Sequence, residues 1–159
     1  MTAIAHHPHR VTRAMAGVRD QLAQVAGVPL WSMDATETTA ALEELLKAEA
    51  QLAELKSRLV RQAEALDIPA RSGATSTATW LAHHTHTTRA DAHRTMRLTA
   101  GLESRDLTRE ALAEGRVHAE QAEAILRALD DLPTDLDPTL VEEAETHCSP
   151  KPNGSTPAR

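Results

Sequence analysis

Aromatic side chains are almost absent from this 159-residue sequence, which has no Phe or Tyr and only two tryptophans, Trp31 and Trp80. Any hydrophobic core must therefore be built from Leu, Ala, Val and Met. Ala and Leu are also among the strongest helix formers, so the composition favours an all-α fold. The length suits one domain with additional residues at its ends.

Cysteine is equally scarce, since Cys148 is the only one in the sequence. A single cysteine excludes an internal disulfide and a metal site built from Cys-x-x-Cys motifs. The sequence also lacks the apolar segment of a secretory signal and any run approaching the ~20 apolar residues of a membrane span. It has no glycine-rich phosphate loop and no nucleophile elbow. We therefore expect a cytoplasmic protein that is not an enzyme and has no cofactor, metal ion, small-molecule substrate or membrane partner.

The net charge of −6 is distributed unevenly along the chain. Residues 34–70 contain eight acidic and four basic side chains, whereas residues 71–105 contain five arginines and two acids. Residues 106–132 are acidic again, with seven acids and three bases. The overall charge argues against a general nucleic-acid binder, but it leaves one basic segment between two acidic ones.

Hydrophobic periodicity and helix-end signals predict an all-α fold in which one long leucine-rich helix packs with a series of shorter helices. The expected helices cover residues 11–26, 35–66, 77–85, 89–102, 109–114, 119–132 and 139–147. Asp34 and Glu37 are spaced as a capping box at the start of the long helix. We expect a helical domain over residues 10–147, with a disordered N-terminus (1–9) and a disordered tail (148–159).

The long helix has an apolar residue at nearly every position of a heptad pattern. Five leucines define what we call the leucine seam: Leu45, Leu52, Leu55, Leu59 and Leu66. Ala41 and Ala48 occupy two of the intervening positions, and Gln62 interrupts the last one. A helix roughly 45 Å long, at about 1.5 Å per residue, normally packs on a partner. The pattern favours packing within the domain, with a homodimer through the long helix as the alternative.

Residues 77–96 are rich in histidine and raise the question of a metal site. Only residues three or four apart share a helix face, so His83 and His86 form the one suitable pair in the cluster. His86 lies where the helix should end, and no carboxylate or thiolate stands at ligand spacing. We therefore interpret the cluster as a polar helix end and predict no metal site.

The same segment fits a helix-turn-helix pattern, in which two helices flank a turn with one left-handed residue. The buried positions of that pattern would be Leu81, Ala82, Ala92 and Thr95. His86 takes the left-handed position, usually Gly, at a cost of about 1 kcal/mol. Thr87 takes the apolar turn position, and Thr88 and Asp91 are spaced as a capping box. His86, Thr87 and Thr95 are poor choices for the motif.

The second helix of this pair would direct four basic side chains outward: Arg89, His93, Arg94 and Arg97. Arg89 could reach a base edge or a phosphate, and Arg94 and Arg97 could contact the backbone of a duplex. This is our DNA-binding hypothesis. The alternative is that these arginines pair with the acidic helices on either side.

Two segments, STATWLAHHTHTTRADAHRTMRLTAGL and TREALAEGRVHAEQAEAILRAL, resemble the domain of unknown function 222, also called the 13E12 repeat family. The resemblance covers about residues 34–132. The matching residues are Trp80, Leu81, Ala82, Arg89, Ala90, Asp91, Ala92, Arg97, Leu98, Leu112, Ala113, Gly115, Ala119, Glu120 and Ala122. His86 and Thr87 stand where the family prefers Gly-Leu, and His118 stands where it prefers Ser or Thr.

The resemblance implies a helical domain of the kind usually found before an HNH endonuclease domain. An HNH site needs a metal-binding His, a general-base His and a polar residue on a ββα frame, and only His147 with Cys148 offers a fragment of one. We therefore expect no HNH domain and no nuclease activity here. The leading hypothesis is a non-catalytic helical domain that associates with double-stranded DNA or assists DNA processing. The alternatives are a helical dimerisation or protein-interaction module and a truncated remnant without independent function.

Overall fold

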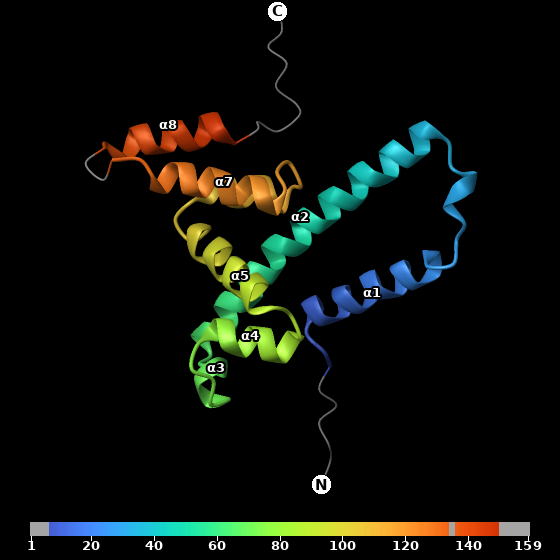
Figure 1. The fold of residues 1–159 in the computed structure, drawn as a ribbon, viewed down its shortest axis with the longest axis horizontal. Helices are drawn as coiled ribbons and strands as arrows, with labels where there is room; N and C mark the ends of the chain where they lie inside the picture. The colour runs from blue at the N-terminus through green and yellow to red at the C-terminus, as the bar shows by residue number, and fades with distance from the viewer. Residues whose placement is uncertain (1–6, 134–135, 150–159) are drawn as a thin grey trace, which may run out of the picture. The chain divides into compact units, whose positions relative to one another are not determined.

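The structure is a computed structural model that describes residues 7–133 and 136–149 (Figure 1). Every regular element in these residues is a helix, which confirms the all-α fold. The chain divides into two compact units, Met1–Ala40 and Ala41–Arg159. The greater parts of the expected disordered ends, 1–9 and 148–159, lie outside the described residues, and the last helix includes Cys148.

The first unit contains α1 (Arg10–Val25), the 3₁₀ turn η1 (Leu30–Ser32) and the start of α2. The predicted capping box at that start is confirmed, because the Asp34 N–H donates to Glu37 Oε2 (3.0 Å) and the Glu37 N–H donates to Asp34 Oδ1 (2.8 Å). These two bonds satisfy amide groups that a helix N-terminus leaves unpaired. None of the described residues in α1 or η1 is buried.

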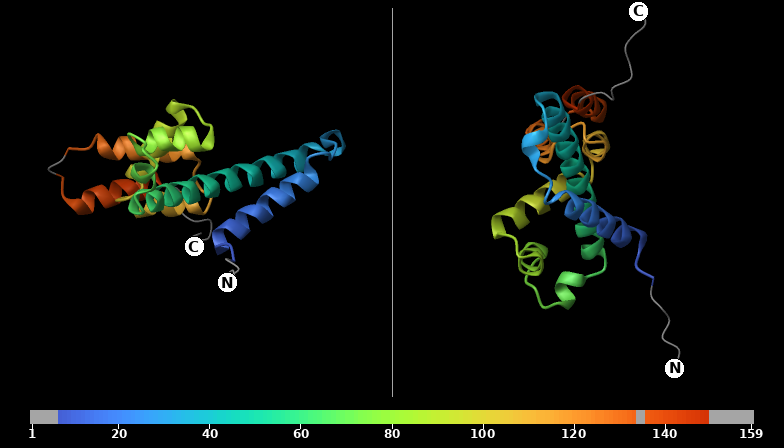
Figure 2. Two further views of the ribbon diagram at one scale, coloured as in Figure 1. Left: turned by 90° about the horizontal axis from the view of Figure 1, so that it is seen from below. Right: turned by 90° about the vertical axis from the view of Figure 1, so that its right-hand side faces the viewer.

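The second unit contains the rest of α2 and six further helices. Their bounds are α2 (Ala35–Ala65), α3 (Ile68–Arg71), α4 (Thr77–Thr85), α5 (Arg89–Gly101), α6 (Asp106–Ala113), α7 (Ala119–Asp130) and α8 (Pro138–Cys148). Most predicted ends are confirmed to within two residues. The helix α6 begins three residues earlier than expected, and the single turn α3 was not expected. Figures 1 and 2 show α7 and α8 side by side.

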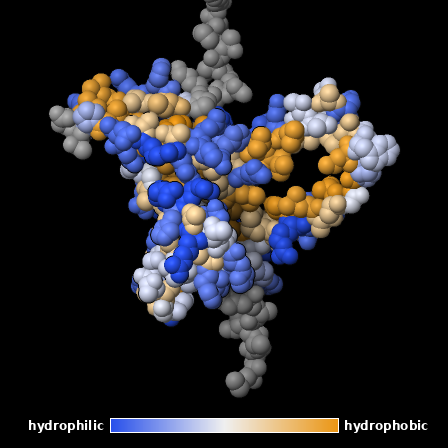
Figure 3. All heavy atoms as spheres, in the orientation of Figure 1, coloured by the Kyte–Doolittle hydropathy of each residue, from blue (hydrophilic) through white to orange (hydrophobic). Residues whose placement is uncertain are grey.

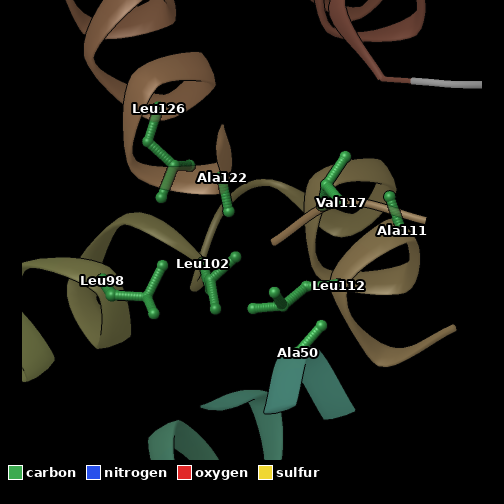
Figure 4. Close-up of a cluster of buried hydrophobic side chains, with 8 residues drawn as sticks. All are labelled: Ala50, Leu98, Leu102, Ala111, Leu112, Val117, Ala122 and Leu126. Carbon is green, nitrogen blue, oxygen red and sulfur yellow. The ribbon is translucent and has the colours of Figure 1, made fainter. Parts of the chain in front are cut away.

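The larger core cluster joins four helices of the second unit (Figure 4). Its members are Ala50, Leu98, Leu102, Ala111, Leu112, Val117, Ala122 and Leu126. In Figure 4, Leu102 and Leu112 lie at the centre, with Ala50 of α2 on one side and Ala122 and Leu126 of α7 on the other. The cluster contains no ring, so close approach over alanine replaces aromatic bulk.

A second, smaller cluster fixes the α4–α5 pair to α2. It consists of Val60, Ala78, Leu81 and Ala92, with Trp80, Ala82 and Met96 packed at its edge. The helix α2 thus carries two contact points, Ala50 in the larger cluster and Val60 in the smaller one. An ion pair between Arg61 and Glu103 (3.1 Å) adds a link from α2 to the turn after α5.

The leucine seam does not form this core. The exposed fractions of Leu45, Leu52, Leu59 and Leu66 are 49%, 39%, 48% and 51%, and Leu55 is half-buried. The buried residues of α2 are instead Ala50, Glu54, Ser57, Val60 and Ala63. The sequence favours packing of the leucine seam within the domain, and this prediction is therefore wrong.

The physical reason is that α2 packs through small side chains. A Cβ on Gly115, in the turn between α6 and α7, would lie 2.9 Å from Lys47 Cβ and 3.0 Å from Lys47 Cα. The turn therefore approaches the backbone of α2 at Lys47 so closely that a side chain at position 115 would clash with it. Gly115 also has a φ of +71°, which other residues adopt at a cost.

Candidate nucleic-acid interface

The turn between α4 and α5 has the left-handed residue that the sequence predicts. Ser76 caps the start of the helix α4, and its Oγ accepts from the Thr79 N–H (3.1 Å). The helix is closed by the next residue after Thr85, His86, which has φ 55° and ψ 31°. The N–H of Thr87 donates back to the Ala82 carbonyl (3.1 Å), a bond typical of a helix closed by a left-handed residue.

The cap at the start of α5 differs in one bond from the predicted capping box. Thr88 Oγ1 accepts from the Asp91 N–H (3.1 Å), as expected. The Asp91 carboxylate, however, accepts from the Thr88 hydroxyl (2.7 Å), where a capping box uses the Thr88 backbone N–H. The side chains of Thr88 and Asp91 therefore hold each other at the surface, and the carboxylate lies in the first turn, where a helix favours negative charge.

One face of the α4–α5 pair is buried as predicted. Leu81, Ala92 and Thr95 are buried, and Ala82 is half-buried. Thr87 is an exception, because it is exposed and its hydroxyl pairs with that of Thr85 (3.0 Å). The apolar contact expected at the turn is therefore replaced by a surface hydrogen bond between two threonines.

The opposite face of α5 carries the four predicted basic residues, and all four are exposed: Arg89, His93, Arg94 and Arg97. They are exposed because Ala92, Thr95 and Leu98, which alternate with them along the helix, fix the other side in the core. Figure 3 shows hydrophilic side chains over the viewer's side of α4 and α5. The structure thus places these side chains together on one accessible side of α5.

The ion pairs on this surface are few. Arg94 Nη1 lies 3.1 Å from Asp91 Oδ1, with both side chains about half exposed. A surface pair of this kind contributes at most about 1 kcal/mol and is weakened by salt. Within residues 7–133 and 136–149, neither Arg89 nor Arg97 has a carboxylate at ion-pairing distance. Pairing with the neighbouring acidic helices, the alternative interpretation, therefore does not occur at these two arginines.

Arg97 borders a surface hollow of about 390 Å³ between α5 and α7, which the sequence did not reveal. Arg127 of α7 lines the same hollow, together with Glu123 and Asp130. Arg97 therefore shares this hollow with two carboxylates and a second arginine. The sequence did not predict that Arg127 lies near α5, because the two are far apart in the sequence and come together only where α5 packs on α7.

The histidine cluster has a contact of another kind. The His84 ring stacks on Trp80, with ring centroids 5.2 Å apart and an interplanar angle of 14°. In the part of the chain that the structure describes, no group of three or more His, Cys, Asp or Glu side chains is arranged to hold a metal ion.

These observations define the chain as an all-α domain built on one long helix, with an exposed basic side on α5. Residues 39–159 match the family described as "Domain of unknown function (DUF222)", and the chain belongs to that family. The match covers most of residues 34–132, which carry the resemblance, and continues to residue 159. No curated protein and no solved structure gives a match. No described helix is long and apolar enough to cross a membrane.

Proposed function

We propose that this chain is a non-catalytic helical domain that associates with double-stranded DNA through the exposed side of α5. The observation that carries the proposal is the exposure of Arg89 and Arg97 without an acidic partner among the described residues. Its resemblance to domains found before HNH endonucleases supports an accessory role in DNA processing.

In the proposed mode of binding, α4 and α5 act as a helix-turn-helix pair and α5 lies in the major groove. Arg89 stands at the N-terminal end of α5, the end that contacts base edges in such motifs. Arg94 and Arg97 lie further along α5, about one turn apart, and contact phosphates, and His93 immediately precedes Arg94. The Arg94–Asp91 pair opens at little cost because both side chains are exposed.

The experiment measures the affinity of the full chain for a labelled duplex of two helical turns by fluorescence anisotropy over a range of salt concentrations. Each neutralised phosphate contributes about 0.9 to the fall of log K with log[salt]. Replacement of Arg89, Arg94 and Arg97 by Ala should therefore weaken binding and flatten the slope by about 2 to 3.

A matched control replaces Arg10, Arg13 and Arg19 on α1, which are also exposed, and changes the net charge by the same amount. We expect this control to keep most of the wild-type slope. Equal losses in the two triple variants would show that binding follows net charge and not α5. A wild-type chain that binds no duplex even at low salt would refute the proposal.

A second candidate function is a helical interaction module that acts through the leucine seam. The observation that favours it is the exposure of four seam leucines on a helix that already packs on the domain through other residues. Soluble proteins seldom leave a continuous apolar patch of this kind uncovered.

A further inference from the structure

The exposed apolar surface of α2 is longer than the seam alone. Beside Leu45, Leu52, Leu59 and Leu66, it includes Leu42 and Leu46, whose exposed fractions are 54% and 41%. Figure 3 shows apolar side chains gathered along the part of α2 that extends away from α4, α5 and α7. The small seam positions Ala41 and Ala48 are exposed too.

This surface has the geometry of a coiled-coil interface. Leucines seven residues apart remain on one side of a helix when a partner helix of the same period supercoils with it. Leu45 and Leu52 lie on the side of α2 opposite the buried Ala50 and Glu54, so the core does not obstruct them. In the C-terminal half the buried Ala63 lies beside Leu59 and Leu66, which are nevertheless 48% and 51% exposed. The partner that fits best is another helix with the same heptad spacing.

The charges that flank the seam favour one orientation of that partner. The N-terminal half of the seam is flanked by Glu44 and Glu49, and the C-terminal half by Lys56 and Arg58. Glu44 and Arg58 pair within α2, with Lys47 and Glu54. Among the described residues, Glu49 and Lys56 form no ion pair, and both are exposed.

We propose that the leucine seam binds the seam of a second copy of this chain in an antiparallel orientation. In an antiparallel pair, residues that flank the seam on the same side face each other, so Glu49 lies beside Lys56 of the second copy, twice per dimer. A parallel pair would instead bring Glu49 close to Glu44 of the second copy, and like charges there oppose association.

The antiparallel register also matches large side chains with small ones. Leu52 lies opposite Leu55 of the second copy at the centre of the interface. Leu59 and Leu66 lie opposite Ala48 and Ala41 of the second copy, which leave room for them. Only Leu45 faces a polar side chain, Gln62 of the second copy.

An apolar hollow in the second unit gives an independent argument for this orientation. The hollow has a volume of about 290 Å³ and lies between α2 and the α4–α5 pair. Lys56, Leu59, Val60 and Trp80 are among the residues that line it. Antiparallel pairing places Leu42 and Leu46 of the second copy along this side of α2, where they cover the hollow. The seam and the hollow thus form one continuous surface through Leu59.

The first experiment measures the mass of the full chain by sedimentation and light scattering over a wide concentration range. We expect a monomer–dimer equilibrium. Leu52→Gln should raise the dimer Kd by about two orders of magnitude, because each copy contributes one buried leucine. The matched control, Leu140→Gln, changes a leucine of similar exposure on α8 and should leave the Kd unchanged.

The second experiment tests the orientation with charge reversals. E49K and K56E should each raise the dimer Kd about tenfold, since each creates two like-charge contacts. An equal mixture of the two variants should form heterodimers with a Kd near that of the wild type. A parallel pair predicts the opposite for E49K, which would then bind more tightly through Glu44 of the second copy.

A chain that stays monomeric at every concentration would overturn the proposal, as would tighter association of E49K. The proposal deepens the interaction candidate and does not depend on DNA binding. Because these measurements contain no DNA, failure of self-association and failure of the α5 proposal are distinguished.

Discussion

Replacement of Glu145 by Ala tests how α8 is held to the second unit. Glu145 is 5% exposed, although it lies on a helix whose other acidic residues face solvent. Its Oε1 accepts from the N–H (2.8 Å) and the hydroxyl (2.9 Å) of Thr108, in the first turn of α6. Thr108 is fully buried, so water cannot replace the carboxylate.

The magnitude follows from the two donors that the substitution leaves without a partner. An orphaned buried donor costs about 1–3 kcal/mol, and the hydroxyl can turn toward another acceptor whereas the amide cannot. We therefore expect Glu145→Ala to lower the free energy of unfolding by about 2–4 kcal/mol. Glu145→Gln keeps an amide oxygen in place and should cost only about 1 kcal/mol.

Urea unfolding followed by circular dichroism measures the free energy, and hydrogen exchange measures protection of the Thr108 amide. Glu143→Ala on the exposed side of α8 is the control and should change stability by less than about 0.5 kcal/mol. If Glu145→Ala behaved like this control and the Thr108 amide remained protected, the carboxylate would not be what joins α8 to α6.

Two further predictions concern the ends of helices. His86→Gly should raise the free energy of unfolding by about 0.5–1 kcal/mol, because the left-handed φ of 55° strains any residue with a Cβ. His83→Gly, in the interior of α4, should lower it by about 1 kcal/mol, and urea unfolding that ranked these two variants in the reverse order would contradict the assignment of strain to His86. At the start of α8, the pKa of Asp137 lies below its ordinary value of 3.8, because its carboxylate accepts from the hydroxyl and the N–H of Thr139. A carboxyl with a lowered pKa stabilises the folded state above pH 3.8, and this contribution is lost as the pH falls through the lowered pKa. Thr139→Ala should move the pKa of Asp137 back toward 3.8 in an NMR titration, and an unchanged pKa would exclude the hydroxyl as its cause.

Local signals in the sequence predicted most helix ends correctly, because those ends depend on neighbouring residues. Asp34 with Glu37 and Thr88 with Asp91 mark the starts of α2 and α5 within a span of four residues. The turn α3 escaped prediction because it is a single turn that begins next to a proline, Pro69. A four-residue helix has too few residues for any periodicity to appear.

The prediction for the packing face of α2 is wrong, because a row of leucines does not by itself mark the buried face of a helix. The buried residues of α2 are two alanines, a serine, a valine and a glutamate. The turn at Gly115 approaches the α2 backbone at Lys47, which lies outside this set. Gly115 could have indicated where α2 is contacted, since a glycine in a tight turn often marks a close contact of two backbones. The number of apolar residues on a helix face therefore did not reveal which face this domain buries.

The outward side of α5 was predicted correctly for a reason that also limits what the sequence reveals. Because Ala92 and Thr95 are buried, the other side of α5 faces solvent. Helical spacing alone predicts which basic residues lie on that side: Arg89, His93, Arg94 and Arg97. The carboxylates near Arg97 come from α7, whose position depends on the whole larger cluster. Sequence spacing therefore identifies the basic residues but not the potential that they produce together.

The two proposed surfaces have a common consequence if both operate. Antiparallel pairing of identical helices has a twofold axis, so a dimer through the leucine seam would carry two copies of α5 related by that axis. A duplex bound by both copies would need matching half-sites, and the second contact would form at a high effective concentration. A single α5 with two unpaired arginines would then need only modest affinity, because the dimer supplies the second set of phosphate contacts. The exposed leucines of α2 and the exposed arginines of α5 would in that case serve one binding event, with α2 determining how far apart the two contacts lie.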